Sequence, residues 1–122
     1  MDERTLIALK ASIEKWEKNA TFTDIDTIKT NAGDCPLCYL FNYYIKQNCY
    51  GCPVSEKTGS RFCINTPYSK ADRLYDKLLR FMLSCWDEEE AKRSPLMNQL
   101  TQQFREAALE EVEFLKSLLP TE

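Results

Sequence analysis

Apolar residues recur at three- and four-residue spacing near the start of the chain, a period typical of an amphipathic helix. This stripe consists of Leu6, Leu9, Ile13 and Trp16. Charged side chains surround it, and Asp2 stands where it can cap the first turn. The pattern predicts a helix over residues 3–19.

The helical period is lost between residues 20 and 34, where Thr, Asp, Asn and Gly predominate. Phe22, Ile25 and Ile28 are the isolated apolar positions of this segment. We therefore expect an ordered loop that these three side chains hold against the core.

A second helical pattern starts at Ser69, because Ser69 and Asp72 have the spacing of a capping box. Its apolar stripe consists of Leu74, Leu78, Met82 and Cys85. We expect this helix to end in the acidic stretch 87–90, and we expect Cys85 to be a small buried hydrophobic side chain.

A third helix is predicted to begin at Ser94 and Pro95, which are typical of the N-cap and of the first helical position. Its apolar face consists of Met97, Leu100, Phe104, Ala108, Val112, Leu115 and Leu119. With a link of two to four residues, residues 69–119 should form an antiparallel hairpin. Phe114 and Leu118 widen the apolar face, which makes a homo-oligomer through this helix one expectation.

The composition narrows the functional classes. The 122 residues suffice for a single domain over 1–122, and 43% are hydrophobic. A net charge of −3 argues against binding to nucleic acid or to an anionic membrane by charge. The chain has no His, which excludes catalytic sites built on imidazole, and no other catalytic constellation is visible. We therefore do not expect an enzyme.

The N-terminus, Met1-Asp2-Glu3-Arg4, is unlike a basic export signal, and the uncharged run Leu37–Ile45 is far too short to span a membrane. We expect a cytoplasmic protein. Grouped cysteines in a reducing compartment more often hold a metal ion than form disulfides.

Five of the six cysteines lie between residues 35 and 63. They form two CxxC pairs, Cys35 with Cys38 and Cys49 with Cys52, followed by Cys63. Each CxxC turn can aim two thiolates at one ion, and four thiolates close a tetrahedron around Zn²⁺ at roughly 2.3 Å. The pattern predicts a metal-binding core over residues 34–68.

Proline follows Cys35 and Cys52 directly, which places both cysteines at predicted N-caps. Leu37, Leu40, Phe41 and Tyr44 would line a helix over residues 36–47, and Gly59 would end a helical turn over 54–58. At an N-cap the helix dipole favours a thiolate, so we expect lowered thiol pKa values there.

Five cysteines compete for at most four positions at one zinc ion. We favour Cys35, Cys38, Cys49 and Cys52 as ligands, because paired CxxC loops close at a small cost in chain entropy. Cys63 in place of Cys49 or Cys52 is the main alternative. A four-cysteine iron–sulfur cluster is also open, since Cys-Pro junctions occur at such clusters.

Aromatic side chains crowd the cysteine segment, with Arg61 among the basic residues near them. Most of this aromatic content is expected to fill the core around a metal. Arg61 and Tyr68 are nevertheless candidate ligand-binding residues for a small molecule or a nucleotide.

The runs DCPLC, CYGCPVSEKTG and FCINTPY, preceded by SIEKWEK, resemble small cysteine-rich proteins of tailed phages and prophages. The pattern of that family is CxLC, CxGCP, a TG turn and CxxTPY, and it covers roughly residues 12–68 of this chain. The resemblance implies a phage-like origin and links all five cysteines. It implies no activity.

The sequence as a whole predicts a mostly α fold: an N-terminal helix, an irregular metal-binding middle segment and a C-terminal helical hairpin. The expected function is that of a small zinc-stabilised binding protein, a phage accessory factor that engages a host protein in the host cytoplasm. The alternatives are a protein that sequesters a small ligand or nucleotide to counter host immunity, and an iron–sulfur or redox protein.

Overall fold

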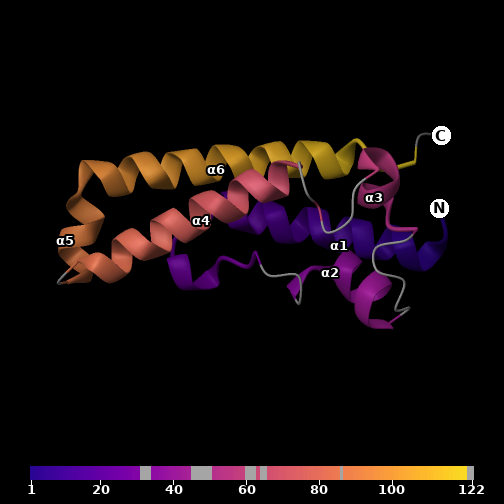
Figure 1. Cartoon of the computed structure of the whole chain (residues 1–122), viewed down its shortest axis with the longest axis horizontal. Coiled ribbons are helices and arrows are strands. Elements are labelled where there is room, and N and C mark those ends of the chain that lie inside the picture. The colour runs from indigo at the N-terminus through magenta and orange to yellow at the C-terminus, as the bar shows by residue number, and fades with distance from the viewer. Residues whose placement is uncertain (31–33, 45–50, 60–62, 64–65, 86, 121–122) are drawn as a thin grey trace.

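The computed structural model describes residues 1–30, 34–44, 51–59, 63, 66–85 and 87–120 (Figure 1). This part of the chain is mostly helical and contains no strand, as the sequence predicts. Its elements are α1 (Glu3–Ala20), η1 (Ile25–Thr27), α2 (Pro36–Cys38), η3 (Tyr39–Tyr44), α3 (Pro53–Thr58), α4 (Pro67–Ser84), α5 (Glu88–Arg93) and α6 (Pro95–Lys116).

The predicted N-terminal helix is α1. The Asp2 carboxylate accepts a hydrogen bond of 2.7 Å from the Thr5 backbone N–H, which satisfies one donor of the first turn. Leu9, Ile13 and Trp16 are buried, and α1 packs along α6. The apolar stripe of this helix therefore faces the core, as its period predicts.

The loop after α1 is ordered by the three apolar side chains expected to hold it, since Phe22, Ile25 and Ile28 are all buried. Asn19, at the end of α1, adds two hydrogen bonds to the backbone of Lys29, at 2.9 and 3.1 Å. These bonds hold the backbone of Lys29 against the end of α1, shortly before the cysteine segment begins.

The helix α4 begins at Pro67 rather than at Ser69, so the predicted capping box of Ser69 and Asp72 is wrong. Thr66 is the N-cap, and Pro67 occupies the first helical position, where its fixed φ suits the helix and its missing N–H costs nothing. Ser69 lies inside the first turn, and its hydroxyl has a different partner, described below.

The same helix ends at Ser84, before the acidic stretch, and Cys85 is a half-buried C-cap. Asp87 starts the short helix α5 instead and accepts a hydrogen bond from the Glu90 N–H at 2.6 Å. The acidic residues thus lie at a helix N-terminus, where the helix dipole favours them, rather than at a C-terminus.

The last helix, α6, begins as predicted, with Ser94 as the N-cap and Pro95 after it. It runs antiparallel to α4 (Figure 1), and an ion pair of 3.3 Å joins Lys70 to Glu110 across the two. The expected link of two to four residues is wrong, because α5 lies between the two helices. The predicted apolar face of α6 is buried from Met97 to Leu115, with Phe104 fully enclosed, whereas Leu119 lies after the end of the helix and is half-buried.

Candidate metal centre

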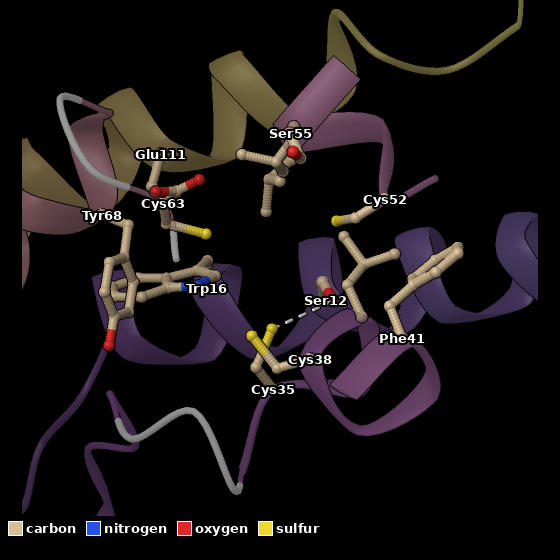
Figure 2. A pocket seen from close by; sticks show the side chains of 13 residues that line it. Ser12, Trp16, Cys35, Cys38, Phe41, Cys52, Ser55, Cys63, Tyr68 and Glu111 are labelled. Carbon is tan, nitrogen blue, oxygen red and sulfur yellow. Dashed lines mark hydrogen bonds between the residues drawn. The ribbon is translucent and has the colours of Figure 1, made fainter. Parts of the chain in front are cut away.

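One pocket is lined by all four clustered cysteines that the structure describes: Cys35, Cys38, Cys52 and Cys63. They come from three separate segments, and their sulfur atoms face the same central space (Figure 2). The remaining lining residues are Ser12, Trp16, Leu37, Phe41, Val54, Ser55, Tyr68, Glu111 and Leu115.

Two of these cysteines occupy the N-caps that the Cys-Pro pairs predict. Cys35 precedes α2 and Cys52 precedes α3, each in extended conformation with proline in the first turn. Gly59 ends α3 in the left-handed conformation at φ 72°, as expected of a glycine stop. The expected turns that carry these two cysteines therefore form.

The helix predicted over residues 36–47 is not a regular α-helix. A single α-helical turn, α2, passes into the π-helical segment η3, and residues 45–47 lie outside the described residues. Leu37, Leu40 and Phe41 are buried as their spacing predicts. A π-helical segment is rare and often occurs near a functional site.

Cys63 has an unusual backbone. Its φ of 60° makes it the one non-glycine residue with a positive φ in the described part of the chain. Its carbonyl oxygen accepts two hydroxyl hydrogen bonds, from Thr66 at 2.7 Å and from Ser69 at 2.9 Å. These bonds tie the Cys63 backbone to the start of α4.

The helix α1 forms one wall of the pocket. Ser12 Oγ donates to the Ala8 carbonyl at 2.9 Å and lies 4.0 Å from Cys35 Sγ. Trp16 meets Tyr68 edge to face, with ring centroids 5.9 Å apart. The N-terminal helix and the start of α4 thus enclose the cysteines from two sides.

Cys35 is a poor thiolate without a metal. A hydrogen bond with the Cys38 side chain, followed by burial, raises the pKa of the Cys35 thiol well above its usual range. In the metal-free protein the thiol pKa at this N-cap is therefore raised, rather than lowered as the sequence predicts. A metal ion binding here would have to displace the Cys35 proton.

Glu111 of α6 also lines the pocket with only 3% of its surface exposed, a feature that the sequence analysis did not predict. Burial, followed by the charge of Cys35, raises the pKa of its carboxyl group to about 7, while Lys15 and the Tyr68 backbone partly oppose that rise. Its Oε2 atom has no hydrogen-bond partner among the described residues. Glu111 stands between Ala108 and Leu115 on the apolar face of α6. A carboxylate on an otherwise apolar helix face was the signal that could have revealed it.

Lys15 is a half-buried residue near this site whose ammonium nitrogen is shielded from solvent. Its ammonium nitrogen has no hydrogen-bond partner among the described residues and lies 5.4 Å from the Trp16 ring centroid. Burial lowers the pKa of Lys15, while the charges of Cys35 and Asp34 act in the opposite direction. Lys15 thus places positive charge on the side of the pocket where Cys35 lies.

The pocket is small. The cavity at its centre measures about 20 Å³, roughly the space of one water molecule or one ion. Within the described residues, no three Cys, Asp or Glu side chains stand close enough to coordinate a metal ion as they are. The sulfur atoms would have to move closer together to bind one.

The other predicted site residues are Cys49, Arg61 and Tyr68. Cys49 and Arg61 lie outside the described residues. Tyr68 lines the cysteine pocket, but its hydroxyl already donates to the Thr30 carbonyl oxygen at 2.5 Å. The polar end of Tyr68 therefore has a structural partner.

No protein-family model matches the chain, and comparisons with curated proteins and with solved structures found no similar protein. Among the helices described, none is both long enough and apolar enough to cross a membrane.

Proposed function

We propose that this chain is a small metal-stabilised binding protein that holds a single zinc ion in the cysteine pocket. The observation that carries the proposal is the convergence of four thiols, from α2, the N-cap of α3 and the turn before α4, on one space. Four thiolates are the ligand set of closed structural zinc sites.

The proposed ligands are Cys35, Cys38, Cys52 and Cys63. All four line the pocket, and among the described residues no backbone hydrogen bond outside the helices joins these three segments to one another. Because a metal ion would join all three segments, its binding free energy would contribute directly to folding.

The size of the pocket favours one ion over an iron–sulfur cluster. A cavity of about 20 Å³ suits a single ion, whereas a cluster of several iron and sulfide atoms needs far more room. It also argues against a nucleotide bound among the cysteines, since ligand pockets usually measure about 300–1,000 Å³.

Elemental analysis of protein purified under reducing conditions without added metal tests this function. We expect one zinc per chain, no visible colour and, after cobalt substitution, intense thiolate-to-cobalt absorption. Cys63→Ser should lose the metal, whereas Cys85→Ser, which changes a cysteine outside the pocket, should keep it. Metal-free protein from zinc-replete cells would overturn the proposal, and brown protein containing iron and sulfide would replace zinc with a cluster.

The biological role that we propose is that of a phage accessory factor that engages a host protein in the cytoplasm. This part rests on the resemblance of the cysteine pattern to phage proteins. Affinity capture with the metal-loaded protein should retain one defined host protein in stoichiometric amount. Equal retention by the chelator-treated protein would show that partner binding does not depend on the metal ion.

A further inference from the structure

The start of α4 is built in an unusual way. Thr66 is its N-cap, and a threonine in that position normally accepts a hydrogen bond from a backbone N–H of the first turn. Here the Thr66 side chain makes no such cap. Its hydroxyl instead donates backwards to the Cys63 carbonyl oxygen at 2.7 Å.

Ser69, inside the first turn of α4, makes the same kind of bond. Its hydroxyl donates to the same Cys63 carbonyl oxygen at 2.9 Å, although the predicted capping role would have directed it toward α4. One carbonyl oxygen thus receives two side-chain hydroxyls, from residues three and six positions later in the chain. Both bonds act on the conformation of Cys63.

Cys63 needs such support, because the left-handed conformation at φ 60° is unfavourable for every residue except glycine. Such strain persists only where the surroundings hold it in place, and it tends to occur at functional sites. In this conformation the Cys63 sulfur points into the pocket (Figure 2).

We propose that Thr66 and Ser69 are positioning residues, whose hydroxyls hold Cys63 in the left-handed turn that presents its thiolate to the metal ion. This inference rests on the proposed zinc site. It adds that two side-chain hydroxyls from the start of α4 hold the backbone of the fourth ligand in place.

Zinc affinity, measured by competition with a chromophoric chelator, tests this role in the full-length protein. Thr66→Val and Ser69→Ala should each weaken zinc binding by about tenfold or more, as is typical when a residue that orients a ligand is lost. Their cobalt-substituted forms should show weaker thiolate-to-cobalt absorption. Thr66→Ser keeps the hydroxyl and should restore wild-type affinity.

Asp87→Ala is the matched control, because it removes a true N-cap bond, from the Glu90 N–H, at the start of α5. It should lower the melting temperature and leave zinc affinity unchanged. The inference is overturned if Thr66→Val and Ser69→Ala bind zinc as tightly as the wild type, or if Asp87→Ala weakens binding equally. If Thr66→Val fails to fold, Ser69→Ala alone decides. A wild-type protein that binds no zinc would instead refute the proposed function itself.

Discussion

Ser12 Oγ lies 4.0 Å from Cys35 Sγ, so that the N-terminal helix touches the cysteine segment through a hydroxyl and a sulfur. The Ser12 hydroxyl already donates to the Ala8 carbonyl oxygen, and the Cys35 thiol already makes a hydrogen bond with the Cys38 side chain. The Ser12 hydroxyl could donate to a Cys35 thiolate only by giving up its bond to Ala8.

This contact leads to a first prediction. Ser12→Ala should change zinc affinity by less than about tenfold, because a contact of 4.0 Å to sulfur is weak. Chelator competition measures the affinity. Ser84→Ala is the control, because it removes a similar hydrogen bond from a helical serine hydroxyl to the Phe81 carbonyl oxygen, away from the pocket. It should leave zinc affinity unchanged. A loss of binding as large as that from a ligand variant would show that Ser12 does more than fill the pocket wall.

The left-handed backbone at Cys63 gives a second prediction, which concerns stability rather than metal. Cys63→Ala and Cys63→Gly both remove the thiol, but only glycine adopts φ 60° without strain. In chelator-treated protein, Cys63→Gly should therefore be more stable than Cys63→Ala by about 1 kcal/mol. Denaturant unfolding measures the difference, and equal stabilities would show that the turn relaxes when the metal is absent.

The fully buried Phe104 ring gives a third prediction. It contacts Phe22 edge to face at 5.7 Å and also meets Tyr75, and thereby joins α6 to the loop after α1 and to α4. Phe104→Ala should destabilise the protein by about 3–5 kcal/mol through the cavity that it leaves. Leu109→Ala, on the exposed side of the same helix, should change stability by less than about 0.5 kcal/mol. Thermal unfolding of the two variants would contradict this if their melting temperatures fell equally.

The sequence predicts correctly those elements at which several neighbouring residues indicate the same structure. Ser94 and Pro95 mark the start of α6 because capping and proline chemistry agree there, and the same holds for Cys52 with Pro53 at α3. Each of these starts depends on neighbouring residues alone. Local patterns therefore sufficed to place them.

The features that the sequence did not predict depend on contacts between distant segments. The spacing of Ser69 and Asp72 matches a capping box, but the Ser69 hydroxyl goes to Cys63, whose left-handed φ no residue identity reveals. Glu111 was missed for a similar reason, since it is buried at a pocket that distant segments of the chain form together. The candidate site could be predicted as a set of cysteines, but not as a pocket with its supporting side chains.

The buried carboxyl group of Glu111 gives a last prediction, on pH. Its pKa is raised from 4.5 to about 7 in the folded protein, chiefly by burial, so the folded state binds the proton more tightly than the unfolded state does. The stability that this group contributes is fully present below about pH 4.5 and is lost as the pH rises to about 7. The loss amounts to about 3 kcal/mol.

Glu111→Gln should remove this dependence, so the stability difference between the variant and the wild type should grow in favour of the variant from pH 4.5 to pH 7. Urea unfolding at a series of pH values, in the same buffer for both proteins, measures that difference. The comparison isolates Glu111, because the cysteine thiols are present in both. Glu113→Gln, an exposed carboxylate on the same helix, controls for the change in net charge. Parallel curves for Glu111→Gln and the wild type would show that the buried carboxyl group titrates alike in the folded and unfolded states.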